Sequence, residues 1–366
     1  MKDSTLRNWL WFFGILSLSL LIFAVFAPLI IPKSNPEWLP SLNYQAGNEI
    51  GITLNGLMSP FIGISAALLT FIAFLVQYQA NKKIQEQFKI QEVDQLFFEM
   101  LKLHKENVNE FNIDGYDHIV TKQSGDKYSL QKIQRQTSQR KVFVTMVTEL
   151  EAIIEIAQLM LQPKTDKDKE RLFQVAYEIF FFGIESENVQ KWNFYRFQQF
   201  KLKLKNIRKK HSDSYSKENK FNINGRYIPL YIKYKPFSGH ENRLGHYYRH
   251  LYSTVDYIVS REKDNIISKD KAKHYLKLLR AQLSNDEQLF LYYNYRIGFG
   301  ENWDKRSKKR KNKFLTEYKM IHNIPVKRVK FIERPEDHFK DYIETKNSYL
   351  FEQYNPERKP EKLDNL

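Results

Sequence analysis

The sequence predicts a mainly α-helical membrane protein: two N-terminal transmembrane helices, then an otherwise all-helical cytoplasmic domain with a small β-hairpin. Two uncharged apolar stretches near the N-terminus indicate the transmembrane helices. Apolar residues at three- and four-residue spacing along most of the remaining chain indicate the helical domain. A segment of alternating residues around Asn224 and Gly225 indicates the hairpin.

The first apolar stretch covers about residues 9–31 and the second about residues 57–76, and neither contains a charged residue. At a rise of about 1.5 Å per residue, each is long enough to cross a hydrocarbon layer roughly 30 Å thick. Backbone amides find no partners in lipid, so we expect each stretch to be a helix. A cleaved signal peptide is the alternative for the first stretch, because Lys2 and Arg7 precede it. Its length and the second stretch argue against cleavage.

Basic residues near the ends of the two stretches lie on their outer flanks: Lys2, Arg7, Lys82, Lys83 and Lys89. The connecting segment carries only Lys33. Because Lys and Arg remain on the cytoplasmic side of a membrane, we expect a multi-pass protein with both termini in the cytoplasm.

The second stretch also carries small residues four apart, at Ser59, Gly63 and Ala67. Such a stripe lets helix backbones approach closely in lipid. Packing against the first span and self-association of two chains are both consistent with it.

The chain has 366 residues, a formal net charge of +16 and no cysteine. The absence of cysteine excludes disulfides, thiolate zinc sites and cysteine nucleophiles. The positive charge indicates an acidic partner, which includes nucleic acid, anionic lipid and acidic protein.

Beyond residue 77 the helical pattern continues, so the second span is expected to extend as one long helix. A polar loop is expected over 112–138, followed by helices at about 139–161, 166–182, 188–210, 243–260, 269–282, 285–296 and 312–322. Ser284 and Glu287 form a capping box before the apolar run LFLYYNY at 289–295. The hairpin at 221–237 has the Asn-Gly pair of a type I′ turn. Pro229 lacks a backbone N–H, so any strand that contains it is expected at the edge of a sheet. The predicted divisions are a membrane anchor (1–78), a helical cytoplasmic domain (79–300) and a basic, then charged, helical tail (301–366).

Seven basic residues cluster near the start of this tail: Lys305, Arg306, Lys308, Lys309, Arg310, Lys311 and Lys313. Phosphate groups of nucleic acid or the anionic inner leaflet of a membrane are suitable partners for such a patch. A solvated loop without a partner is the third interpretation.

No complete phosphate-binding loop, dinucleotide fingerprint or serine nucleophile motif is present, and Gly298-Phe299-Gly300 lacks the third glycine. His246 and His250 are four apart on a predicted helix, but no third metal ligand accompanies them, so neither a metal nor a cofactor is expected. Arg243 and His250 fit the loose R-x6-H pattern of HEPN-type ribonucleases, in which the pair acts on the scissile phosphate. A tethered ribonuclease therefore remains an alternative.

Two stretches of the sequence carry recognisable motifs. The first runs from Asn55 to Glu110, and the second, at 239–258 and 274–294, contains the blocks LGHYYRHLY and RAQLS-x-x-E. Together they resemble the AbiC-like family of bacterial phage abortive-infection membrane proteins. The residues that match the family motif are Leu244, Gly245, His246, Tyr248, Arg249, Leu251, Tyr252, Arg280, Ala281, Gln282, Leu283, Ser284, Glu287 and Asn294. We expect Arg280 and Glu287 to pair with polar groups of the helix at 246–250.

The resemblance implies a protein of the bacterial inner membrane that limits phage spread at the cost of the infected cell. The expected mechanism is non-enzymatic: the cytoplasmic domain senses a phage-derived trigger or a companion defence protein, and the helices then perturb the membrane. The alternatives are the tethered ribonuclease and a scaffold that recruits other defence proteins. A homo-oligomer and a nucleic-acid partner for the basic patch are consistent with all three.

Overall fold

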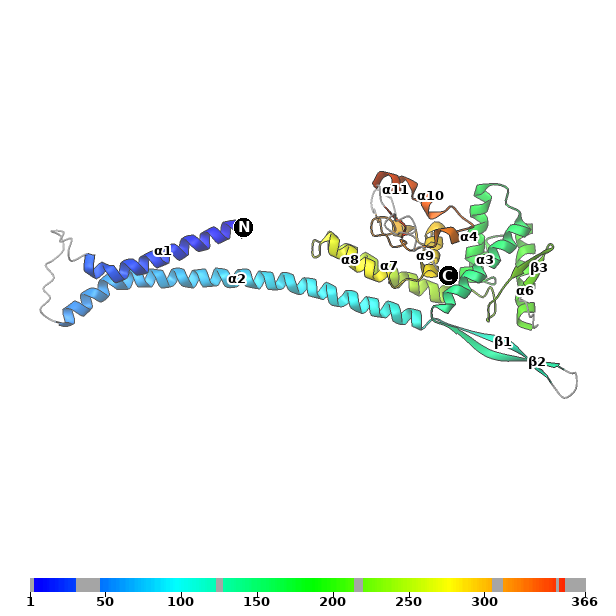
Figure 1. The fold of residues 1–366 in the computed structure, drawn as a ribbon, viewed down its shortest axis with the longest axis horizontal. Coiled ribbons are helices and arrows are strands. Elements are labelled where there is room, and N and C mark those ends of the chain that lie inside the picture. Colours follow the sequence, from blue (N-terminus) through cyan, green and yellow to red (C-terminus); the bar gives the residue numbers. More distant parts are fainter. Residues whose placement is uncertain are drawn as a thin grey trace, which may run out of the picture. The chain divides into compact units, whose positions relative to one another are not determined.

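In the computed structural model, residues 3–30, 47–122, 128–213, 220–304, 312–346 and 349–352 are described (Figure 1). The described chain is mainly helical, with two small antiparallel hairpins. It divides into two compact units, residues 1–91 and 92–366, which are treated separately below.

The first unit consists of α1 (Asp3–Ile30) and the first part of α2 (Gly47–Asn109). The two helices pack in antiparallel fashion, since Phe13 contacts Phe71 while Phe23 contacts Phe61. At the centre of this contact, Ser17 Oγ donates to the carbonyl of Ser65 at 3.1 Å and Ser65 Oγ donates back to the carbonyl of Ser17 at 3.2 Å. Both hydroxyls thus have partners without water, as an apolar solvent requires.

Two segments of these helices, Arg7–Phe26 and one that starts at Met58, are long and apolar enough to cross a membrane. Most of their side chains are exposed on the unit, and the large apolar ones among them include Trp11 at 68% and Phe74 at 63%. Ser59, Gly63 and Ala67 are also exposed, and a Cβ added at Gly63 would meet no atom within 4 Å. The small-residue stripe therefore does not pack against α1, and self-association through it stays a prediction.

The expected extension of the second span is confirmed, because α2 is one helix of 63 residues. Its last turns belong to the second unit, where Val93, Phe97, His104 and Val108 are buried.

The core of the second unit is built around α3 (Lys141–Leu161), which contacts α4 (Asp166–Phe182), α6 (Tyr195–Asp213) and α9 (Asn285–Arg296). The helix α7 (Glu241–Lys263) packs against α8 (Lys269–Arg280) and α4. The helix expected at 188–210 is divided into α5 (Glu187–Gln190) and α6. Lys191 and Trp192 both donate to the buried carboxylate of Glu178, at 2.9 and 2.7 Å, and these bonds hold the break in place.

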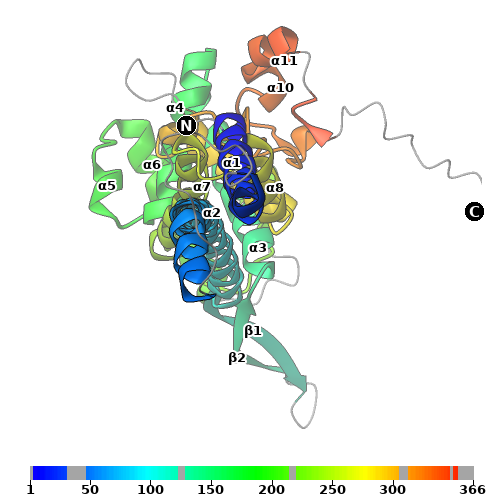
Figure 2. The same ribbon diagram turned by 90° about the vertical axis from the view of Figure 1, so that its left-hand side faces the viewer.

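The prediction of a polar loop at 112–138 is wrong. These residues form β1 (Asn112–Lys122) and β2 (Tyr128–Ser138), a hairpin that projects from the rest of the second unit (Figure 2). Polar residues occur on both faces, so the sequence shows no apolar alternation. The hairpin is anchored at Tyr116, whose N–H donates to the carbonyl of Lys233 at 2.7 Å. Gly115 permits this approach, because a Cβ there would lie 1.8 Å from the same oxygen.

The second hairpin, β3 (Lys220–Ile223) and β4 (Arg226–Pro229), is confirmed. Asn224 and Gly225 have φ values of 52° and 86°, as a type I′ turn requires.

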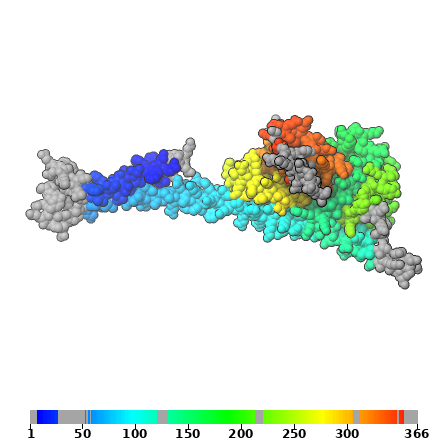
Figure 3. Space-filling view, viewed as in Figure 1, coloured from blue at the N-terminus to red at the C-terminus, as the bar shows by residue number. Residues whose placement is uncertain are grey.

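After α9 the described residues form short elements only: η1 (Glu301–Asp304), η2 (Val326–Arg328), α10 (Pro335–His338) and α11 (Lys340–Lys346). The prediction of a helix at 312–322 is wrong, because this segment forms turns. Asp304 Oδ2 accepts from both the N–H and the hydroxyl of Thr316, at 3.1 and 2.8 Å, and Phe314 and Leu315 are fully buried. This segment and those after it pack onto the preceding helices, as Figure 3 shows for the orange and red part.

Candidate ligand-binding cleft

The start of α7 is fixed by a buried carboxylate, Glu149 of α3. Its oxygens accept from Tyr234 Oη at 2.8 Å, from His240 Nε2 at 2.8 Å and from the backbone N–H of Phe237. Glu149 is 0% exposed and His240 is 3% exposed, so this cluster is closed to solvent. It ties the segment before α7 to the centre of the core.

The start of α9 is fixed by the predicted capping box, which is confirmed. Ser284 Oγ accepts from the N–H of Glu287 at 3.3 Å, and Glu287 Oε2 accepts from the N–H of Ser284 at 2.6 Å. The other oxygen of Glu287 accepts from Tyr247 Oη of α7 at 3.1 Å. Burial raises the pKa of Glu287, although the hydrogen bonds from Ser284 and Tyr247 oppose that rise. The capping box thus also connects α9 to α7.

A third polar contact joins α4, α7 and α9. Tyr177 Oη lies 3.5 Å from Tyr248 Oη and accepts from Asn294 Nδ2 at 3.3 Å. Tyr177 is fully buried, and burial raises its pKa to about 12. These three side chains therefore form a neutral hydrogen-bonded floor between the helices.

A cleft of about 680 Å³ opens above this floor, and we call it the motif cleft. It is lined by Phe181, Phe182, Glu241, Asn242, Gly245, Tyr248, Arg249, Asn294 and Phe299. Its volume is within the range of small-molecule sites, roughly 300–1,000 Å³.

One wall of the motif cleft is aromatic. Phe299 meets Phe181 and Phe182 edge to face, at ring-centroid distances of 5.5 and 5.6 Å, and is itself 44% exposed. Across the cleft, the first turns of α7 contribute Gly245 and the exposed side chains of Glu241, Asn242 and Arg249. Arg249 has no ion-pair or hydrogen-bond partner within the described residues. The cleft therefore combines one exposed ring, that of Phe299, with charged groups that are free to bind.

The first motif block and Asn294, which follows the second block on α9, meet at this cleft. Gly245, Tyr248 and Arg249 of the first block and Asn294 beyond the second all line it. Other motif residues support the fold. Leu251 is in the core, Gln282 accepts from Arg140 through its backbone carbonyl at 2.6 Å, and Tyr252 accepts from Asn312 at 3.1 Å. His246 is exposed.

The expected pairing of this second block with the helix at 246–250 is right for Glu287, which binds Tyr247, and wrong for Arg280. Arg280 donates instead to the backbone carbonyl of Lys319 at 3.1 Å. The reason is that the turn segment after residue 312 brings the carbonyl of Lys319 within hydrogen-bond distance of Arg280.

The ribonuclease pair does not lie in the motif cleft. Arg243 Nε donates to the backbone carbonyl of Asn112 at 2.9 Å, at the start of β1. His250 is half-buried and faces His104 of α2, with ring centroids 6.1 Å apart. Burial, with His250 and Arg140 nearby, lowers the pKa of His104 to about 4. Within the described residues, no group of three or more acidic or histidine side chains is arranged for a metal.

Most of the predicted basic patch is not described by the structure. Residues 305–311 lie outside the described part of the chain, and Lys313 is exposed.

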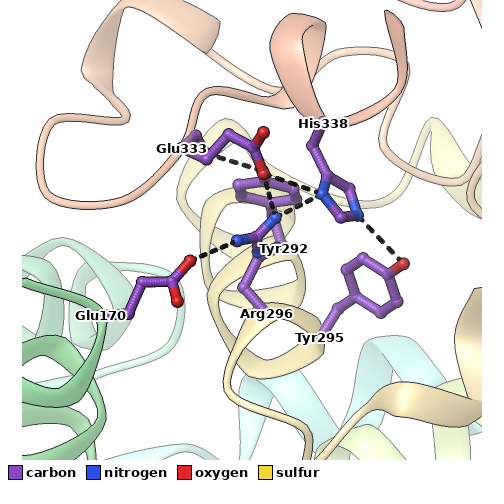
Figure 4. Close-up of polar contacts among 6 residues, drawn as sticks. All are labelled: Glu170, Tyr292, Tyr295, Arg296, Glu333 and His338. Atoms are coloured by element: carbon purple, nitrogen blue, oxygen red, sulfur yellow. Dashed lines mark hydrogen bonds and ion pairs between the residues drawn. The ribbon is translucent and has the colours of Figure 1, made fainter. Parts of the chain in front are cut away.

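A second polar cluster follows Asn294 directly, at the C-terminal end of α9 (Figure 4). Arg296 bridges Glu333 at 2.5 Å and Glu170 of α4 at 3.4 Å, and it also contacts His338. Burial alone would raise the pKa of Glu333, but hydrogen bonds from Arg296 and His338 hold it below its ordinary value. This cluster fastens the C-terminal segments to the end of α9 that carries Asn294.

The aromatic wall and the two first-turn residues of α7 were missed by the sequence interpretation. Phe181 and Phe182 read as ordinary core residues of a helix end, and Phe299 was noted only as part of an incomplete glycine motif. An exposed phenylalanine between two glycines is the one signal that could have identified the wall.

Residues 239–329 match the model of the family described as "Putative phage abortive infection protein". This segment contains α7, α8 and α9 and therefore both motif blocks. None of the curated proteins and none of the solved structures gives a significant match. The segment 239–329 is thus similar to the phage abortive-infection family, and this match supports the AbiC-like resemblance that the two motif blocks predicted.

Proposed function

We propose that this chain is an inner-membrane effector of abortive infection, which senses infection at the motif cleft and then perturbs the membrane. The family match supports a role in phage abortive infection. The observation that carries the mechanism is the convergence of the first motif block and the motif residue Asn294 on one open cleft.

The two apolar helices of the first unit support the membrane part of the proposal. Their large apolar side chains are exposed along most of their length, and a water-soluble unit of this kind would expose far more apolar surface than is usual. Lipid is the solvent that removes this cost. Both termini are then cytoplasmic, because the basic residues flank the spans on their outer sides.

The long helix α2 supports the coupling. It carries the second apolar segment and ends against α7, where Phe111 and His104 contact Tyr247. Tyr247 is the neighbour of Tyr248 in the cleft and binds Glu287 of α9. A ligand that favours one arrangement of α7 therefore biases the helix that enters the membrane.

A membrane-potential dye assay during phage infection tests the proposal. Cells that carry the wild-type chain should depolarise before their bulk RNA is degraded. Gly63→Leu should reduce depolarisation if the exposed small-residue stripe mediates helix contact in lipid, whereas Gly14→Leu is the matched control, since neither glycine has an atom within 4 Å of an added Cβ. RNA degradation without depolarisation would contradict the proposal.

The membrane-tethered ribonuclease is the second candidate, supported by the R-x6-H spacing of Arg243 and His250. It predicts that a foreign two-span anchor replaces residues 1–78 without loss of protection, and that His250→Ala is inactive. A scaffold role predicts instead that protection depends on a second defence protein.

A further inference from the structure

We infer that the motif cleft binds a nucleoside monophosphate, with the base against the ring of Phe299 and the phosphate on Arg249. This inference names a ligand for the cleft of the proposed function. The role of that ligand as a trigger rests on the proposed function. The binding itself follows from three features of the cleft.

The first feature is a ring that is held in place and left open on one side. Phe299 is fixed edge to face by Phe181 and Phe182, yet the residue is 44% exposed and lines the cleft. Glycines flank it: Gly298 has φ +94°, and a Cβ at Gly300 would lie 2.8 Å from Asn294 Oδ1. The backbone there is therefore restricted to glycine on both sides. Planar bases stack on such rings because every base offers a π-face.

The second feature is an unpaired cation on α7, the helix whose first turn also lines the cleft. Arg249 lies two turns into α7, is exposed, and has no ion-pair partner within the described ranges. Its guanidinium matches the geometry of two phosphate oxygens. His240, the N-cap of α7, gives no side-chain cap to the first turn, so the positive end of the helix adds to the field in the cleft. One unpaired arginine suits one phosphate.

The third feature is a set of acceptors and donors for a base edge. Asn294 is 4% exposed; its Nδ2 donates to Tyr177, and its Oδ1 has no hydrogen-bond partner in the part of the chain that the structure describes. The carboxylate of Glu241 and the amide of Asn242 are exposed on the opposite wall. Carboxylates and amides recognise the amino and ring N–H groups of bases. Inorganic phosphate alone would leave these groups and the aromatic wall without a role.

Isothermal titration calorimetry on the full-length chain in detergent micelles tests the inference. The probes are GMP, AMP, CMP and UMP, with guanosine and inorganic phosphate as controls. We expect saturable binding of at least one monophosphate, and weaker binding of both controls. Arg249→Ala and Phe299→Ala should each weaken binding about ten- to a hundredfold. Lys263 is an exposed cation at the far end of α7, so Lys263→Ala should leave binding unchanged.

The absence of binding for all four monophosphates would overturn the inference, as would equal binding of inorganic phosphate or equal binding by Arg249→Ala. These results are separable from the proposed function. A chain that depolarises infected cells but binds no nucleotide contradicts the ligand assignment alone. A chain that binds a nucleotide through Arg249 but never depolarises cells contradicts the membrane role alone.

Discussion

Two polar sites lie at the start of α7, and they are built in opposite ways. At Glu149, three donors occupy a carboxylate that is completely buried. In the motif cleft a few residues further on, Glu241 and Arg249 are exposed and have no ion-pair partner among the described side chains. A closed and satisfied cluster stabilises a junction, whereas an open and unsatisfied one is available to a ligand. The four predictions below test this difference.

Glu149→Ala should have the largest effect on stability. It leaves Tyr234 Oη, His240 Nε2 and the N–H of Phe237 buried without a partner, at a cost of about 3–5 kcal/mol. Urea unfolding in micelles, followed by tryptophan fluorescence, measures it. Glu155→Ala, half-buried on the same helix, should change stability by less than about 0.5 kcal/mol. A stable Glu149 variant would show that the closed cluster is not a structural junction.

Acid should weaken the second unit through His104. The pKa of this buried ring is about 4 in the folded chain, against 6.5 for a free side chain, because of burial and the nearby His250 and Arg140. The unfolded chain then binds the proton more readily, so stability is present above about pH 6.5 and is lost as the pH falls towards 4. The loss is about 3 kcal/mol. Replacing His104 by Leu should flatten the stability profile between these pH values, and an unchanged profile would mean that other groups dominate.

Asn294→Ala should have an intermediate effect. It removes the hydrogen bond to Tyr177 from the floor of the cleft, at a cost of about 1–2 kcal/mol by the same unfolding measurement. It should also reduce phage protection, because the amide contributes to the cleft. Asn242 is exposed, so Asn242→Ala is the control for the stability measurement. A stability loss in Asn242→Ala equal to that of Asn294→Ala would contradict the distinction between floor and wall.

Arg249→Ala should have the smallest effect on stability and a large effect on function. The side chain is exposed and unpaired within the described residues, so its removal should change the unfolding free energy by less than about 0.5 kcal/mol. Protection from phage should nevertheless be lost, as measured by plaque counts at equal protein level. Lys263→Ala should retain protection. A protective Arg249 variant would show that the cleft plays no part in defence.

Much of the second unit could be predicted from local pattern. The helices α3, α4, α7 and α9, the capping box at Ser284 and Glu287, and the turn at Asn224-Gly225 follow from periodicity and capping residues, which act over a few positions. The β1–β2 hairpin could not be predicted, because its stability depends on Gly115 meeting Lys233, far away in sequence. The segment 312–322 reads as a helix, but the contact of Thr316 with Asp304 folds it into turns.

By itself, the sequence determined the two long apolar segments, the single helix that continues from the second of them, and the residue blocks that resemble the abortive-infection family. These are properties of consecutive residues: length, hydropathy, charge at the ends and local motif spacing. Only the tertiary structure decided what the motif does in space. It placed Arg249 in an open cleft and Arg280 against Lys319, and it brought Phe299 from beyond α9 to Phe181 at the end of α4. The reason is that a binding site consists of side chains from distant elements, and packing alone sets which of them remain exposed and unpaired.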